Sequence, residues 1–146
     1  MVMSLAFSLS LLLTSGWMVG RVGAQSSSND LNFAMLTGDS QFFEPVKLGW
    51  EKTCRRLGVS CQYILPICPG IEQMRDLIKQ KVDGIAIAPC SPDEIRPIVA
   101  EATDAGIPVV TFDGDIPNST RAAYVGTDNI FLGRTMAKLL KQLRPE

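Results

Sequence analysis

The sequence predicts an α/β protein with an open parallel sheet and helices on both faces. Three observations favour this fold class. Short apolar runs without polar alternation are typical of strands buried on both faces. Amphipathic helical segments separate these runs, and connections of that length join parallel neighbouring strands. The runs end in Asp, Gly and Asn, residues that hold small ligands at the carboxyl edge of such sheets.

We expect four buried strands joined by three helices. The strands are predicted at 31–37, 60–65, 85–88 and 107–112, and a further short apolar run follows at 122–125. The loops at the strand carboxyl ends, 37–43, 66–70, 89–91 and 113–115, then lie along one edge of the sheet. This edge is where the fold class predicts a ligand site.

The first helix is predicted to run from Pro45 to Leu57. Proline suits the first helical turn because its missing N–H has no partner there, and Gly58 is a typical residue just beyond a helix end. Apolar and small residues recur at steps of three and four along this helix, which predicts one buried face: Val46, Trp50, Thr53, Cys54 and Leu57.

The second and third helices show the same periodicity. The second spans 71–81, and its predicted buried face comprises Ile71, Met74, Leu77, Ile78 and Val82. The third starts with the pattern Ser91 to Glu94, which predicts a capping box with Pro at the first helical position. It should bury Ile95, Ile98, Val99 and Ala102, and Pro97 should bend or loosen its first two turns.

Length and composition exclude several classes of protein. The chain has 146 residues, which suits one domain, and a net charge of −1 disfavours a nucleic-acid partner. It has no histidine, which excludes a Ser-His-Asp triad and a His-containing zinc site. No nucleotide fingerprint occurs either. We therefore expect no metal, no cofactor and no catalytic residues.

The first 24 residues read as a secretory signal peptide. An uncharged apolar run at 2–19 is followed by small residues that predict cleavage after Ala24, and 25–30 is a polar linker. No Lys or Arg precedes the apolar run, so an uncleaved membrane anchor is the alternative. Both interpretations place the folded part outside the cytoplasm, with the membrane touched only through this segment.

Export makes disulfides possible for the four cysteines, Cys54, Cys61, Cys68 and Cys90. No Cys-x-x-Cys pair occurs, and the spacing of seven does not place the first three on one face. Because cysteine is also a common small buried residue, unpaired thiols are favoured over any bridge.

Three segments resemble the type I periplasmic sugar-binding proteins, the ribose-binding-like receptors of ABC importers that share their fold with LacI-type effector domains. They are DGIAIAP at 83–89, AGIPVVTFD at 105–113 and YVGTDN at 124–129, and the resemblance covers 31–146. In that family two lobes close on a sugar. The resemblance implies that 31–126 is the first lobe and that Thr127, Asp128 and Asn129 form a hinge. Residues 130–142 would then start a truncated second lobe.

The resemblance also implies a sugar site. Asp113 would accept hydrogen bonds from sugar hydroxyls, although Gly114 stands where the family commonly has Arg. The alternative for Asp113 is a turn residue. We expect one ring of Phe42 and Phe43 to face the sugar and the other to pack as core, while Asp39 and Ser40 offer polar groups. Asp128 should fix the hinge or cap the following helix.

The expected function is therefore an exported binding protein for a sugar or a related polar ligand, serving ABC transport or sensing with a permease or sensor as partner. A fragment of a sugar-acting α/β enzyme and a non-functional fragment are the alternatives. A LacI-type regulator would need a DNA-binding motif before Leu31, where an apolar segment stands instead. The tail at 130–143 should also expose an apolar surface that invites a partner or aggregation.

Overall fold

The computed structural model describes residues 30–66, 68 and 70–144, and within them it shows one five-stranded sheet. The strands are β1 (Asn32–Leu36), β2 (Ser60–Ile64), β3 (Gly84–Ile87), β4 (Val109–Phe112) and β5 (Ala123–Val125), in the order β2-β1-β3-β4-β5. Every neighbouring pair is parallel. The helices are α1 (Glu44–Leu57), α2 (Ile71–Gln80), α3 (Pro92–Asp104) and α4 (Asn129–Leu143), with a short 3₁₀-helix, η2 (Gln41–Phe43). The predicted fold class is confirmed.

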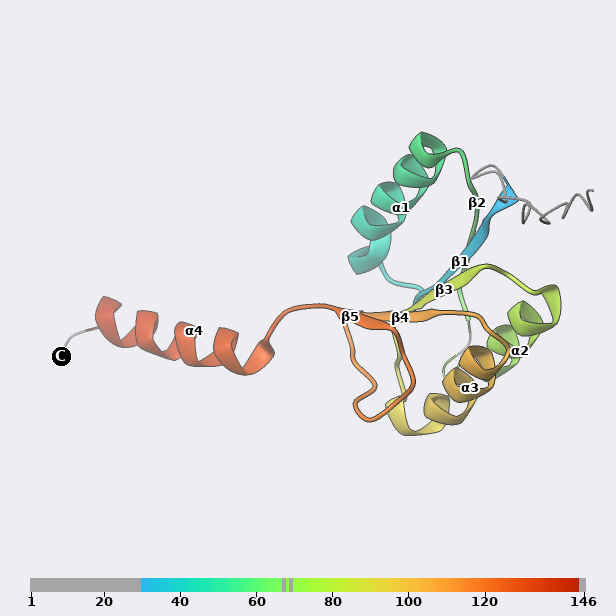
Figure 1. The fold of residues 1–146 in the computed structure, drawn as a ribbon. Helices are drawn as coiled ribbons and strands as arrows, with labels where there is room; N and C mark the ends of the chain where they lie inside the picture. Colours follow the sequence, from blue (N-terminus) through green and yellow to red (C-terminus); the bar gives the residue numbers. More distant parts are fainter. Residues whose placement is uncertain (1–29, 67, 69, 145–146) are drawn as a thin grey trace, which may run out of the picture.

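The hydrophobic core lies on one side of the sheet. Helices α2 and α3 cover this side, whereas α1 lies on the other (Figure 1). Because side chains alternate along a strand, every second residue of β1, β3 and β4 enters the core. The core contains Ala34, Leu36, Ile85, Ile87 and Val109 from the strands, packed on Met74, Leu77, Ile95, Ile98, Val99 and Ala102. The predicted inner faces of α2 and α3 are therefore largely confirmed.

The opposite side of the sheet is less well covered, because α1 buries little. Cys54 is its only buried residue, and Leu57 is 54% exposed, so the predicted buried face of α1 is wrong in extent. Thr53 is also exposed. The indole Nε1 of Trp50 is buried without a hydrogen-bond partner. Helix α1 lies beside β2 at the sheet edge, so its inner side chains meet few strands.

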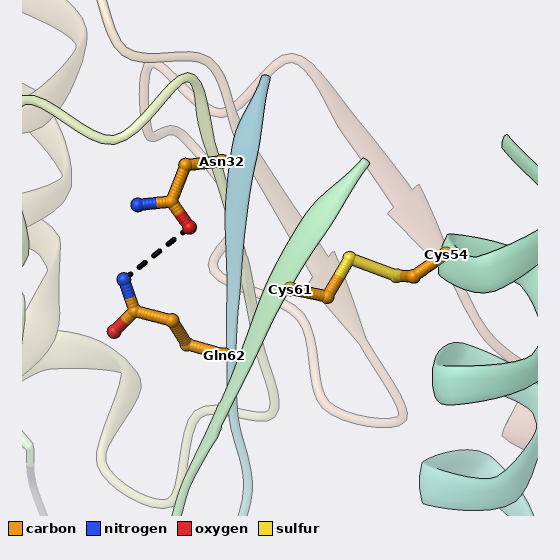
Figure 2. Close-up of a disulfide and its surroundings, with 4 residues drawn as sticks. All are labelled: Asn32, Cys54, Cys61 and Gln62. Atoms are coloured by element: carbon orange, nitrogen blue, oxygen red, sulfur yellow. Dashed lines mark hydrogen bonds between the residues drawn. A yellow bond between two sulfur atoms is a disulfide. The ribbon is translucent and has the colours of Figure 1, made fainter. Parts of the chain in front are cut away.

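Both pairs of cysteines form disulfides, so the prediction of unpaired thiols is wrong. Cys54 in α1 is bonded to Cys61 in β2, with 6.2 Å between the Cα atoms (Figure 2). Cys68, after β2, is bonded to Cys90, after β3, with 6.1 Å between the Cα atoms. The turn after α1 brings the helix back against the strand that follows it, and the second bridge joins two loops at one sheet edge. The spacing of the cysteines in the sequence does not predict that either pair comes close enough to form a bridge.

A polar pair lies near the first disulfide on the other side of β2 (Figure 2). The amide of Gln62 donates to the side-chain oxygen of Asn32 in β1, and Nε2 to Oδ1 is 3.3 Å. Asn32 and Gln62 thus link the first two strands through their side chains as well as through the backbone. Cys61 and Gln62 point to opposite faces, as neighbours in a strand must.

The start of α3 differs from the predicted capping box. The Ser91 side chain makes no hydrogen bond to the backbone of the first turn. Its hydroxyl instead donates to the carboxylate of Glu94, and Oγ to Oε1 is 2.7 Å. Pro97 lies inside α3, which continues as one helix from Pro92 to Asp104. Proline has no N–H to donate, so one backbone hydrogen bond is missing from the second turn of this helix.

The connection from β4 to β5 contains no helix. Residues 113–122 form a loop, yet the two strands are parallel neighbours. The loop spans this unusually short crossover by packing Ile116, which is fully buried, into the core beside α3. The loop thereby becomes a fixed part of the carboxyl edge of the sheet.

The predicted signal peptide at 1–24 lies outside the described residues, as does nearly all of the 25–30 linker. Within 30–66, 68 and 70–144, no helix has the length and apolar character needed to cross a membrane.

Candidate functional site

A cavity of about 410 Å³ opens at the carboxyl ends of the strands. This is the edge at which the loops after β1, β3 and β4 meet, so the predicted convergence of these loops is confirmed there. Nine residues line the cavity: Met35, Phe42, Phe43, Val46, Ala86, Val110, Phe112, Asp113 and Val125. Asp113 is the only charged residue among them, so the cavity has an apolar wall and one carboxylate.

Three aromatic rings form the wall. Phe42 and Phe43 lie in η2, with ring centroids 5.1 Å apart in an edge-to-face arrangement. Phe43 also meets Phe112 at the end of β4, edge to face, at 6.2 Å. Phe42 is 65% exposed, while Phe43 is half-buried between its two neighbours. One ring is thus partly enclosed by the protein and the other is open to solvent.

Asp113 stands at the point where β4 ends. Its backbone is left-handed, with φ of 59°, a conformation that Asp adopts more readily than most residues. Its N–H donates to the carbonyl of Val125 at 3.1 Å, and its own carbonyl accepts from the hydroxyl of Tyr124 at 3.0 Å. The backbone of Asp113 is therefore fixed from β5, while its side chain is exposed at the cavity mouth.

Two glycines permit this arrangement. A Cβ on Gly114 would lie 3.1 Å from the carbonyl oxygen of Pro89, so the loop after β4 can rest on the loop after β3. A Cβ on Gly126 would lie 2.0 Å from the Tyr124 hydroxyl oxygen, which is an impossible contact. Glycine at 126 thus leaves room for the ring that holds Asp113 in place.

Asp39 and Ser40 are not among the residues that line the cavity. The Ser40 side-chain oxygen accepts the N–H of Phe42 at 3.1 Å and thereby caps η2. Ser40 fixes the two aromatic residues that follow it, and Asp39 is exposed in the same loop. Of the five predicted ligand residues, the structure brings together Phe42, Phe43 and Asp113.

An ion pair fixes the loop that follows Asp113. The carboxylate of Asp115 accepts two hydrogen bonds from the guanidinium of Arg121, and Nη2 to Oδ2 is 2.7 Å. It also accepts from the hydroxyl of Thr111 at 3.0 Å and from the N–H of Ile116 at 2.7 Å. The hydrogen bond from Arg121 lowers the pKa of Asp115 far below its ordinary value, against the opposing effect of burial.

We therefore expect the Asp115–Arg121 pair to give the protein an acid-sensitive part of its stability. Because the folded-state pKa of Asp115 is depressed, this contribution is present above the ordinary Asp pKa near 3.8 and is lost as the pH falls below it. Asp115→Asn should reduce the fall in unfolding free energy between pH 5 and about pH 2, measured by urea denaturation at each pH. Asp76→Asn, on an exposed pair in α2, is the control and should leave that fall unchanged. An equal acid dependence in the Asp115 variant and the parent would contradict the assignment.

Residues 127–129 lead away from the site. Asp128 has extended backbone geometry, and its carboxylate accepts the N–H of Phe131 at 2.9 Å. The prediction that Asp128 caps the following helix is confirmed, and the helix begins at Asn129. The described residues hold no cluster of potential metal ligands.

Sequence reasoning missed several residues that shape this site. Tyr124 and Arg121 act by holding Asp113 and its loop, and Phe112 adds a third ring to the wall. Phe112 could have been found, because it is the last residue of a predicted strand. The contacts of Tyr124 and Arg121 depend on how the 113–122 loop folds back, which has no local signal in the sequence.

Comparisons with known proteins show similarity to periplasmic binding proteins. The family model described as the periplasmic binding protein domain matches residues 31–146. The D-xylose-binding periplasmic protein of Haemophilus influenzae is 30% identical over 76 residues, which make up 52% of this chain and 23% of that protein.

Solved structures of sugar-binding proteins resemble the fold. An ABC transporter solute-binding protein of Burkholderia graminis C4D1M, solved in complex with D-arabinose, has a TM-score of 0.77 and 30% identity, covering 80% of this chain and 42% of its own. GanP, a glucose-galactose binding protein of Geobacillus stearothermophilus, has a TM-score of 0.71 and 34% identity, covering 77% and 42%. The chain thus spans less than half the length of these relatives.

Proposed function

Because the chain belongs to the family of periplasmic binding proteins, whose members bind ligands and are not enzymes, we propose that it forms one wall of a sugar-binding cleft. In this proposal, residues 31–126 are the first lobe, and Thr127, Asp128 and Asn129 form the hinge to a second lobe. The cavity at the carboxyl edge of the sheet is then the half of the cleft that this lobe supplies.

The observation that carries the proposal is the pairing of an aromatic wall with a single carboxylate. A pyranose or pentose has an apolar C–H face that packs on a ring, and hydroxyls that donate to a carboxylate. Phe42 and Phe43 offer the ring surface, and Asp113 offers the two oxygens in the same cavity. The fixed backbone of Asp113 limits the conformations that its side chain must lose on binding.

The sugars bound by the relatives suggest the class of ligand. The similar proteins include one named for D-xylose and one solved with D-arabinose. We propose a monosaccharide of this kind. With Gly114 resting on Pro89, no basic side chain follows Asp113, so this chain offers its ligand fewer polar contacts than the family pattern implies.

The proposal predicts weak binding by this chain alone. One lobe contacts one side of a sugar and leaves water competing for the hydroxyls on the other. Two-dimensional NMR titration with D-xylose, D-arabinose and D-glucose should show shifts confined to residues around Phe42, Phe43 and Asp113. The dissociation constant should lie above the micromolar range, and micromolar or tighter binding would contradict this part of the proposal.

Asp113→Asn should weaken the binding of the best sugar roughly 10- to 100-fold, because charge-assisted hydrogen bonds to the sugar are lost. The matched control is Asp104→Asn at the end of α3, on the opposite edge of the sheet, which should bind as the parent does. Equal binding by the parent and the Asp113 variant would overturn the assignment of the site. Turnover of a sugar would favour the alternative of an enzyme fragment, and no shift with any sugar would favour a non-functional one.

Partners and location follow from the same proposal. The family implies a periplasmic or extracellular location, and we propose that the apolar segment at 1–24 directs export. A permease of the ABC type, or a membrane sensor, would then receive the closed, sugar-bound form. The Burkholderia graminis relative is itself named as an ABC transporter solute-binding protein.

A further inference from the structure

The wall of the cavity at the carboxyl edge carries a negative charge that nothing in the wall offsets. Asp113 is the only charged residue that lines the cavity. The hydrogen bonds of Asp113 are made by its backbone, and within the described part of the chain its carboxylate has no hydrogen bond or ion pair. A ligand that enters the cavity therefore meets an uncompensated carboxylate.

The basic side chains that come next to the cavity along the chain are held by other partners. The guanidinium of Arg121, from the loop after Asp113, makes two hydrogen bonds to the carboxylate of Asp115. Lys47 follows a lining residue of α1, but its ammonium lies over the ring of Tyr63 in β2, 5.4 Å from the ring centroid. Neither cation is therefore directed at the carboxylate of Asp113.

The aromatic rings of the wall also favour a positive charge. The ring of Phe43 stands nearly perpendicular to those of Phe42 and Phe112, at 87° and 89°. An edge-to-face contact covers at most one face of a ring, so Phe42, which is 65% exposed, keeps a free face. The face of an aromatic ring is electron-rich and attracts a cation within about 6 Å of its centroid. Rings and carboxylate thus favour the same ligand group.

The charge of the surrounding protein acts in the same direction. Residues 30–128 carry nine basic and fourteen acidic side chains, a net charge of −5, which attracts cations to the molecule. A neutral ligand would shield the carboxylate of Asp113 from water without supplying a counter-charge, and removing a lone charge from water is costly. An ammonium group on the ligand removes this cost.

We propose that the preferred ligand of this wall is an amino sugar, a monosaccharide with a protonated amino group bound by the carboxylate of Asp113 and the ring face of Phe42. This inference rests on the proposed function and narrows its ligand class. The ammonium donates charge-assisted hydrogen bonds to the carboxylate, while the C–H face of the sugar packs on the aromatic wall. D-xylose and D-arabinose are then weaker ligands of the same cavity.

Three sugars that differ only at the second carbon test the proposal by two-dimensional NMR titration. D-glucosamine carries an ammonium there, D-glucose a hydroxyl and N-acetyl-D-glucosamine a neutral amide. In mildly acidic buffer with matched chloride, D-glucosamine should bind at least roughly 10-fold more tightly than either neutral sugar. Its shifts should centre on Phe42, Phe43 and Asp113, and its affinity should fall as salt is added.

Two variants remove the groups that bind the ammonium. Asp113→Asn should bring the dissociation constants of D-glucosamine and D-glucose to within about twofold of each other, whereas Asp104→Asn at the end of α3 should keep the difference. Phe42→Leu should reduce the preference for D-glucosamine roughly threefold, because leucine is apolar but offers no ring face. Phe131→Leu removes a ring that is 68% exposed outside the cavity and should change nothing.

A third variant supplies the missing counter-charge from the protein. Val125 lines the cavity and is 64% exposed, so Val125→Lys places an ammonium there without opening the core. It should abolish the preference for D-glucosamine, because the carboxylate of Asp113 is then neutralised and the two cations repel. The matched control, Val125→Gln, has a similar length without the charge and should keep the preference. Circular dichroism checks that every variant is folded.

The outcomes separate this inference from the function on which it rests. If D-glucose binds the parent as tightly as D-glucosamine, the amino-sugar assignment is overturned and the sugar-binding function stands. Shifts with D-glucosamine that are spread over the surface, or a preference that survives Asp113→Asn, would also overturn the assignment. No shift with any sugar would overturn the proposed function together with the inference.

Discussion

Replacing Cys68 and Cys90 together by serine is expected to lower the free energy of unfolding by about 3 kcal/mol. The bridge closes a loop with a sequence separation of 22 residues, and the chain-entropy estimate for a loop of this length is about 3.4 kcal/mol. That loss is large for a domain whose total stability is of the usual order of 5–15 kcal/mol. The effect arises mainly because the unfolded chain gains freedom when the loop is opened.

The bridge also joins two loops at the carboxyl edge of the sheet. Cys90 follows Pro89, on whose carbonyl Gly114 rests, so the bridge bears indirectly on the loop that holds Asp113. We therefore expect its loss to broaden the NMR signals of residues near Asp113 even under conditions where the protein stays folded. Urea denaturation followed by circular dichroism measures the stability, and an unfolding free energy within 1 kcal/mol of the parent would contradict the prediction.

The pair Cys54 and Cys61 provides the matched comparison. Its loop has a sequence separation of seven, for which the same estimate gives about 2.4 kcal/mol. This bridge fastens α1 to β2, and α1 buries little else, so its removal should raise hydrogen exchange in α1 more than in α2 or α3. The two double variants should thus differ in where the protein loosens as well as in how much stability it loses.

The parts of the fold that the sequence predicted well are those governed by short-range periodicity. The strands and the inner faces of α2 and α3 follow from apolar residues at fixed steps, and the core between them agrees. The buried face of α1 did not follow, because periodicity tells which side of a helix is apolar and not how much sheet lies beneath it. Leu57 keeps the periodic spacing and is still 54% exposed.

The residues of the candidate site also fall into two groups, those with a local signal in the sequence and those that depend on the tertiary fold. Asp113 was predicted because a strand end is visible in sequence, and Phe42 and Phe43 because they resemble the paired aromatics that follow the first strand in the family. The residues that hold Asp113 and its loop, Tyr124 and Arg121, could not be predicted, because their contacts depend on the path that the 113–122 loop takes in the fold. The disulfides belong to this second group, since the two bridges depend on tertiary approach and not on spacing.

Leu77→Ala is expected to lower the free energy of unfolding by about 2–5 kcal/mol, the range seen when a buried leucine leaves a cavity. Leu77 lies in α2 and is fully buried in the core, in the same cluster as Met74 and Ile98. The removed side-chain atoms lose their burial, and a close-packed neighbourhood collapses only in part to fill the space. The cost depends on how far Met74, a flexible neighbour, can move into the gap.

Leu57→Ala is the matched control, since it removes the same atoms from the opposite side of the sheet. Because Leu57 is 54% exposed, its loss should cost less than about 1 kcal/mol. Chemical denaturation of the parent and both variants under oxidising conditions measures the difference. Similar losses for the two variants would mean that α1 is packed as tightly as α2.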